Sequence, residues 1–210
     1  MAGDSTTARY DPARLARQRE QILAATEELI ALRGFASVRL RDIAKAAGLS
    51  VGALQHHFET RDQLVKEAFR WSCGRRIARW REQPGRGGDP WQRLVRLMAA
   101  TFELTDFRSQ SAIWAEYTAA AFRDEEIRTV MAEVYEQWRI TMRDAVQVGV
   151  DAGRFRPRCS VDTVVNVLSA EIDGLEIASV ISPRGMEVQA LPELLLECAR
   201  ALLRIDDLDG

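Results

Sequence analysis

The spacing of the apolar residues constrains this chain most, because it is helical almost throughout. Residues 40–47 are typical: their apolar side chains recur at i, i+3, i+4 and i+7, as on one face of an α-helix. No segment alternates apolar and polar residues with the period of two that strands require. Asp-Pro pairs at 11–12 and 89–90 have the form of helix starts, and Gly34 and Gly48 have the form of helix ends. We therefore expect an all-α fold of about nine helices.

The start and stop signals also set the expected helix positions. Thr60 and Gln63 form a capping box for the fourth helix, and the Pro- and Gly-rich segment 84–90 is expected to be a turn. The expected helices cover about residues 12–33, 40–47, 51–58, 60–81, 90–105, 109–121, 124–152, 160–181 and 187–204. The first three differ in length and are closely spaced, which predicts a small N-terminal module.

Composition excludes several classes of protein. With 47% hydrophobic and 29% charged residues among 210, the chain has the composition of an ordinary soluble globular protein. The first fourteen residues are polar, unlike a secretory signal, and no apolar run reaches the roughly 18 residues that span a membrane. Cys73, Cys159 and Cys198 are far apart and lack CxxC spacing, which indicates reduced thiols. We therefore expect a cytoplasmic protein that uses no membrane, structural metal or cofactor.

Charge is distributed unevenly along the chain. Residues 1–80 contain 14 basic and 9 acidic side chains, whereas residues 81–210 contain 15 and 22. All but two of the basic side chains are arginine, the exceptions being Lys45 and Lys66. A basic front and an acidic rear indicate that only the front meets a polyanion, although chance would also produce such a difference.

Residues 39–58 have the pattern of a helix-turn-helix motif: a short amphipathic helix, a tight turn containing glycine, and a second helix. Ala44 is small at the point where the two helices must approach closely. Gly48 can adopt the positive φ that the turn demands. A generic helical hairpin is the alternative interpretation of this pattern.

The second helix of this motif is expected to separate an apolar face from a small, uncharged one. At 100° per residue, the side chains that point inward are Val51, Leu54 and Phe58. The outward side chains are Gly52, Ala53 and His56, with Gln55 and His57 on the flanks. Such a face can lie flat in a DNA major groove, which is about 12 Å wide. Basic side chains that could neutralise phosphates surround it: Arg41, Lys45 and Arg61.

A specific family resemblance rests on these residues. The chain contains Gly34-Phe35, Arg41-Asp42-Ile43-Ala44, Ala47-Gly48-Leu49-Ser50, Gly52, Leu54, His57-Phe58, Thr60-Arg61 and Leu64. In this order and spacing they resemble the DNA-binding domain of the TetR family of bacterial transcriptional regulators. The resemblance implies a flexible extension (1–13), a three-helix DNA-binding domain (14–75) and a helical effector-binding and dimerisation domain (76–210). Around Trp114-Ala-Glu and Asp173-Gly-Leu the rear resembles the subgroup that contains the betaine-synthesis repressor.

By this resemblance, DNA contacts are expected from Arg39, Arg41, Lys45, Ser50, Val51, Gly52, Ala53, Gln55, His56, His57 and Arg61. Arg41 is the first choice for a base contact, to guanine, and His56 is the second. His57 and Arg61 are expected to contact phosphate. The chain departs from the family at three positions: Gln55 replaces a tyrosine, Arg39 a capping threonine, and Val51 a lysine or arginine. Gln55 could bind either phosphate or an adenine edge.

The resemblance also places an effector cavity among the rear helices. Candidate wall residues are Phe102, Trp114, Glu116, Tyr117, Tyr135, Trp138, Met142, Glu171 and Asp173. For each aromatic residue and Met142, simple core packing is the alternative. Glu116, Glu171 and Asp173 lie on largely apolar helices, where a partly buried carboxylate could select a cationic or hydroxylated ligand. An internal ion pair with an arginine is the alternative for these three, and the sequence does not choose between the two.

The last two helices, 160–181 and 187–204, are expected to form a homodimer interface. Their apolar faces comprise Val161, Val164, Val165, Leu168, Ile172, Leu175, Leu194, Leu195, Ala199 and Leu202. A two-fold dimer would bind a pseudo-palindromic operator and, as a repressor, leave it when an effector binds. The alternative function is a helical interaction protein without an effector, which binds protein or nucleic acid nonspecifically.

An enzyme is not expected. Residues 48–52 spell G-x-S-x-G, but the nucleophile elbow needs a strand before Ser50, and the preceding residues have helical spacing. We therefore interpret Ser50 as a helix cap. His56 and His57 are adjacent, so their side chains diverge by about 100° on a helix, and the chain has no third histidine to complete a metal site.

Overall fold

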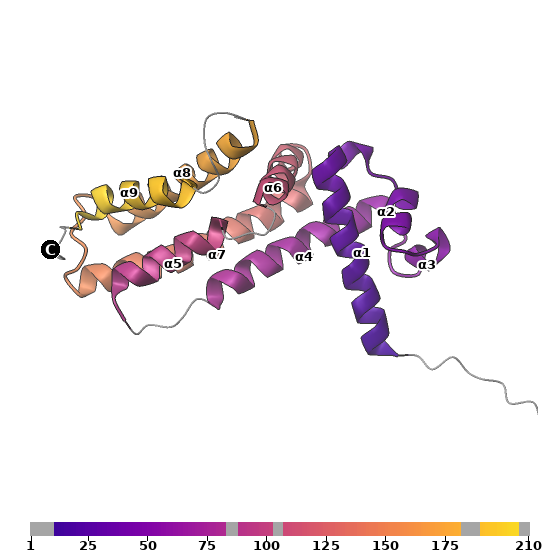
Figure 1. The fold of residues 1–210 in the computed structure, drawn as a ribbon, viewed down its shortest axis with the longest axis horizontal. Coiled ribbons are helices and arrows are strands. Elements are labelled where there is room, and N and C mark those ends of the chain that lie inside the picture. Colours follow the sequence, from indigo (N-terminus) through magenta and orange to yellow (C-terminus); the bar gives the residue numbers. More distant parts are fainter. Residues whose placement is uncertain (1–10, 83–87, 103–106, 182–189, 206–210) are drawn as a thin grey trace, which may run out of the picture. The chain divides into compact units, whose positions relative to one another are not determined.

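The computed structural model describes residues 11–82, 88–102, 107–181 and 190–205, and within these ranges the chain is helical and contains no strand (Figure 1). The all-α prediction is therefore confirmed. The elements are α1 (Pro12–Arg33), η1 (Phe35–Ser37), α2 (Leu40–Ala46), α3 (Val51–Gln55), α4 (Arg61–Arg81), α5 (Pro90–Phe102), α6 (Phe107–Ala121), α7 (Glu125–Asp151), α8 (Val161–Ile181) and α9 (Leu191–Leu203).

The chain divides into two compact units, Met1–Ala68 and Phe69–Gly210. Helix α4 is continuous through the boundary, so its first residues belong to the first unit and its last residues to the second. The domain boundary that the sequence predicts, between residues 75 and 76, also lies inside α4. Because α4 is shared, the division of the chain into functional domains stays a prediction.

The capping residues that the sequence singled out begin their helices as expected. The side chain of Asp11 accepts a hydrogen bond from the backbone N–H of Ala13 at 3.0 Å, and Thr60 Oγ1 accepts one from Gln63 N at 3.1 Å. Helix α3 differs from its prediction, because it ends at Gln55 and not at residue 58. The described residues do not include the expected helix end near residue 105, the expected helix start near residue 187, the segment 84–87 or most of the extension 1–13.

The first unit is held together by apolar side chains from α1 to α4. Those that are fully buried include Ile22, Leu23, Ile30, Val38, Ile43, Leu54, Phe58, Leu64 and Val65. The core therefore draws on every helix of this unit, and it includes Phe58 from the segment that follows α3.

In the second unit α7 is central, because it packs against α5, α6 and α8, and α9 lies along α8 and α5 (Figure 1). The buried side chains of this unit include Leu94, Met98, Tyr117, Met142, Val146, Phe155, Val165, Leu168 and Leu195. Gly149 on α7 lies directly under the Phe155 ring, where a Cβ would clash, so glycine is required there. Among the described residues, no helix is long and apolar enough to cross a membrane.

The burial of the apolar residues on α8 and α9 differs from one part of the dimer prediction. Most of those expected at an interface are buried within the chain itself: Val164, Val165, Leu168, Ile172, Leu175, Leu195 and Ala199. They complete the core of the second unit because α8 packs against both α6 and α7. The large apolar side chains that remain exposed on these helices are Val167, Ile177, Ile181 and Leu194.

Candidate DNA-binding face and effector cavity

The motif that the sequence predicts at residues 39–58 folds as a helix-turn-helix. Ala44 is buried between the helices, and Gly48 adopts a φ of 69° in the turn, where Leu49 N donates to Ala44 O at 2.8 Å. Ser50 caps α3, since its Oγ accepts a hydrogen bond from Ala53 N at 3.1 Å. This serine follows helix α2, so the strand that a nucleophile elbow needs is missing from this part of the described chain.

One side of α3 is anchored and the other is open. Leu54 is fully buried, and Phe58 holds the segment after the helix. The opposite side, which we call the α3 face, consists of Gly52, Ala53, Gln55 and His56. Gln55 and His56 are exposed, and a Cβ added at Gly52 would meet nothing within 4 Å. Within the first unit, this small and uncharged surface is therefore uncovered.

The expected inward position of Val51 is wrong. Its side chain is 39% exposed. Helix α3 is only five residues long and starts at Val51, directly after the Ser50 cap. One buried residue, Leu54, is therefore enough to anchor it, and Val51 remains at the open end of the helix.

The basic residues around the α3 face fall into two groups. Arg39, Arg41 and Lys45 are exposed, and the Arg41 side chain retains 70% of its surface in water. Arg39 forms no side-chain cap of α2, as its substitution for threonine implied. Arg61 is instead bound to the segment between α1 and α2: Nε donates to Val38 O at 2.8 Å, a second nitrogen donates to Phe35 O, and the guanidinium lies 4.9 Å from the Phe35 ring centroid. Arg61 therefore fixes the start of the motif, and the phosphate contact expected of it stays a prediction.

His57 is also bound within the first unit. Its Nε2 lies 3.1 Å from Gln18 Oε1 on α1. Burial, and then the charges of Arg19 and His56, hold the pKa of His57 below its usual value, which favours the neutral ring. Because a carboxamide oxygen only accepts, Nε2 donates to Gln18, and Nδ1 of the neutral ring has no proton to give. The phosphate contact expected of His57 stays a prediction, and it requires the ring to gain a proton or to leave Gln18.

A cavity of about 30 Å³ lies inside the second unit, among residues of α4, α5, α6, α7 and α8. Four of the nine predicted effector residues line it: Trp114, Tyr135, Trp138 and Asp173. The sequence analysis missed the other wall residues, which are Arg76, Trp80, Thr101, Val134, Ser169, Ile172 and Glu176. Ile172 had been expected at a dimer interface.

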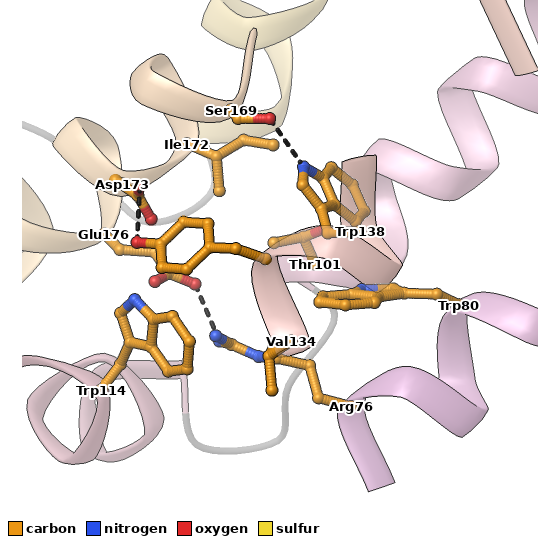
Figure 2. A pocket seen from close by; sticks show the side chains of 11 residues that line it. Arg76, Trp80, Thr101, Trp114, Val134, Trp138, Ser169, Ile172, Asp173 and Glu176 are labelled. Carbon is orange, nitrogen blue, oxygen red and sulfur yellow. Dashed lines mark hydrogen bonds and ion pairs between the residues drawn. The ribbon is translucent and has the colours of Figure 1, made fainter. Parts of the chain in front are cut away.

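Aromatic rings form much of the cavity wall, and polar groups are paired between them (Figure 2). The rings of Trp80 and Trp138 are 4.8 Å apart, and those of Trp114 and Tyr135 are 5.6 Å apart. Trp138 Nε1 donates to Ser169 Oγ at 3.1 Å. The wall thus presents four aromatic side chains, three of them tryptophan, to a small, partly open space.

Two carboxylates and one guanidinium face this cavity. The hydroxyl of Tyr135 donates to Asp173 Oδ2 at 2.8 Å, and Arg76 Nη2 donates to Glu176 Oε1 at 2.8 Å (Figure 2). Burial raises the pKa of Glu176, with the Arg76 charge acting in the opposite direction. Burial likewise raises the pKa of Asp173, although hydrogen bonds from Tyr135 and Trp114 oppose the change. With both carboxylates ionised, the cavity carries one negative charge more than Arg76 balances.

The other predicted effector residues lie elsewhere in the second unit. Phe102 packs on Phe107 with ring centroids 5.4 Å apart, Tyr117 stacks on Phe69 at 3.9 Å, and Met142 is fully buried. None of the three lines this cavity, and their contact with an effector stays a prediction. Glu116 is half-buried on α6 and does not line the cavity. Glu171 meets α9: together with burial, it raises the pKa of the Cys198 thiol to about 11.

Two sequence signals could have found the missed residues. Arg76 and Trp80 are four residues apart on α4 and therefore share one face of that helix, beyond the helix-turn-helix motif. Asp173 and Glu176 are three residues apart on the otherwise apolar α8. In each case, a pair at helical spacing points to a common surface that a single residue does not reveal.

Comparison with known proteins gives two family matches that together cover most of the chain. The family described as BetI-type transcriptional repressor, C-terminal, matches residues 90–204, and the family described as bacterial regulatory proteins, tetR family, matches residues 22–68. The HTH-type transcriptional repressor KstR2 of Mycolicibacterium smegmatis is 29% identical over 157 residues, which are 73% of this chain and 75% of that protein. The HTH-type transcriptional regulator BetI 1 of Chromohalobacter salexigens is 25% identical over 181 residues, which are 84% and 86% of the two chains.

Solved structures agree with these matches. A protein of Saccharomonospora viridis, crystallised in complex with choline, superimposes with a TM-score of 0.80 and 28% identity, covering 87% of this chain and 95% of that one. A TetR transcription regulator of Haloarcula marismortui superimposes with a TM-score of 0.79 at 22% identity, covering 90% and 99% of the two chains, and supports the fold alone.

Proposed function

Because the chain belongs to the TetR family of bacterial transcriptional regulators, with a BetI-type C-terminal domain, we propose that it is a homodimeric repressor released from its operator by a small organic cation. Members of this family regulate transcription and are not enzymes. The DNA-binding part of this proposal rests on the open α3 face. The opposite side of the helix is anchored by the buried Leu54.

Arg41 is the residue we assign to base recognition. Its side chain is 70% exposed, and its ion pair with Asp42 is long, at 4.0 Å. A guanidinium can donate two parallel hydrogen bonds to guanine O6 and N7. Gln55 and His56 provide further hydrogen-bonding groups, and Arg39 and Lys45 provide charge for phosphates. The small side chains at the start of α3 are proposed to let the helix approach the DNA closely: Ser50, Val51, Gly52 and Ala53.

The exposed side of α8 supports a two-fold dimer. Val167, Ala170, Gly174, Ile177 and Ile181 recur every three or four residues along it and are all exposed. Leu194 on the neighbouring α9 adds to this surface. A dimer formed through this stripe would present two α3 helices to half-sites about 34–36 Å apart.

The chemistry of the cavity supports a cationic effector. Tryptophan and tyrosine faces attract cations, and aromatic cages recognise quaternary ammonium groups. The cavity combines four such rings with the carboxylates of Asp173 and Glu176. The similar protein of Saccharomonospora viridis was crystallised with choline, a quaternary ammonium alcohol. We therefore propose a choline-like effector, which reduces operator affinity only as far as it binds the released state more tightly than the DNA-bound state.

Fluorescence anisotropy tests this function. Labelled DNA from the region flanking the protein's own gene is titrated with the protein, with and without an excess of unlabelled random duplex. A repressor should retain the labelled site in the presence of competitor and release it on addition of choline. Equal binding to all duplexes, unaffected by choline, would instead support a nonspecific interaction protein.

A further inference from the structure

Arg76 already places a cation inside the proposed effector cavity. Its side chain extends from α4 into the cavity and is only 16% exposed (Figure 2). The guanidinium carbon lies 4.9 Å from the centroid of the Trp114 ring, and Nη2 lies 2.8 Å from Glu176 Oε1. A ring face and a carboxylate are the two partners that an aromatic cage offers to a bound cation.

Arg76 does not provide partners for all the buried polar groups of the cavity. Glu176 is almost completely buried, yet its second oxygen, Oε2, has no hydrogen-bond partner among the described residues. Thr101 Oγ1, which is also buried and lines the same cavity, likewise lacks a partner there. Buried polar atoms normally find partners, so these two indicate a site that can bind more than Arg76 alone.

The cavity is too small for a second cation beside the first. Its free volume of about 30 Å³ corresponds to roughly one water molecule. A trimethylammonium group is several times larger than water. Removing Arg76 without a replacement would leave the buried Glu176 carboxylate unpaired, which is strongly unfavourable. Exchange of one cation for another avoids that cost.

We propose that Arg76 is a built-in competitor of the effector: it occupies the cation position of the ligand-free cavity, and the effector displaces it from Trp114 and Glu176. The nature of the displacing ligand rests on the proposed function, whereas the role of Arg76 rests on its own contacts. Arg76 lies on α4, which begins at Arg61, the residue that fixes the start of the helix-turn-helix motif. Displacement of Arg76 therefore acts on the one described helix that both units share.

The test measures binding of tetramethylammonium and choline, by calorimetry at constant ionic strength, to the wild type, Arg76→Ala and Arg93→Ala. Arg93 is a matched control, because it is 17% exposed, lies 2.6 Å from Asp144 in the same unit, and does not line the cavity. Tetramethylammonium cannot donate a hydrogen bond, so only an aromatic and anionic cage attracts it. Arg76→Ala should bind it about tenfold more tightly than the wild type, and Arg93→Ala should match the wild type.

The outcomes separate this inference from the proposed function. Suppose that the wild type binds choline and that Arg76→Ala binds neither cation more tightly than the wild type does. This result would overturn the competitor role of Arg76 and leave the proposed effector unaffected. If Arg76→Ala binds the two cations and the wild type does not, the competitor role is supported and release of the wild type by choline is refuted. If Arg76→Ala does not fold, tetramethylammonium must restore its cooperative thermal unfolding, and failure to do so overturns the inference. Arg76→Gln, which keeps a hydrogen-bond donor for Glu176, provides the same comparison in a milder variant.

Discussion

The two units of this protein assemble their candidate sites in opposite ways. The α3 face is built from neighbouring residues in the chain, and its important side chains are exposed. The cavity of the second unit brings together residues such as Arg76 and Glu176, which are 100 positions apart, and buries them. A site of the first kind needs one well-formed motif, whereas a site of the second kind needs the correct offsets of five helices. The predictions below use substitutions that should affect one site and spare the other.

The largest effect is expected from Leu54→Ala. Removal of a fully buried leucine should lower the free energy of unfolding of the first unit by about 2–5 kcal/mol and abolish operator binding. Choline binding in the second unit should persist. Thermal unfolding, anisotropy and calorimetry measure the three quantities. Leu32→Ala is the matched control, because that leucine is 78% exposed on α1 and its truncation should change little.

Arg41→Ala should come next. Loss of a base contact should weaken specific operator binding by about 1–3 kcal/mol, without changing the thermal unfolding of the protein. Anisotropy with specific and random duplexes gives the ratio of the two affinities. Arg123→Ala, an exposed arginine of the second unit, serves as control. An equal loss on both duplexes would mean that Arg41 contacts phosphate and does not read a base.

Trp114→Leu should reduce choline affinity by about tenfold, since it removes a ring that faces the cation position. Operator affinity in the absence of choline should remain within twofold of the wild type. Trp91→Leu is the comparison, because Trp91 is equally buried in the second unit but lies outside the cavity wall. Equal effects of the two substitutions on choline binding would argue that Trp114 acts through general stability.

The smallest effect concerns pH. The pKa of His57 is lowered in the folded protein, so the unfolded chain binds the proton more readily. The stabilisation from neutral His57 is present above its ordinary pKa of about 6.5 and is lost as the pH falls below it. His57→Gln should therefore flatten the decline in stability of the first unit between pH 7.5 and 5.5. His56→Gln keeps His57 and removes only one of the weaker causes of its lowered pKa, so it should flatten the decline less than His57→Gln does.

The sequence predicted the first site well because the physics that shapes it is local. Gly48, Ser50, Leu54 and Phe58 lie within eleven residues, and each performs the structural role that its type and spacing indicated. Val51 was placed wrongly, because periodicity assumes a full helix and α3 ends after five residues.

The second site could be predicted only in part, because helix offsets decide which faces meet. Trp114, Tyr135, Trp138 and Asp173 were identified from residue type and family resemblance, and they line the cavity. Phe102 and Met142 have the same apolar character, yet they pack in the core. Arg76 was missed because the wall candidates were chosen among aromatic, apolar and acidic side chains, and no local pattern links it to Glu176.

Footprinting tests the central claim most directly, because it reports the geometry of two α3 faces on DNA. Hydroxyl-radical cleavage of the region flanking the protein's own gene should show two protected patches, centred one helical turn or a multiple of it apart, about 10 base pairs per turn. Arg41→Ala should lose this pattern at protein concentrations that still coat random DNA. Uniform protection without paired patches, unchanged by Arg41→Ala, would contradict the assignment of α3 as the recognition helix.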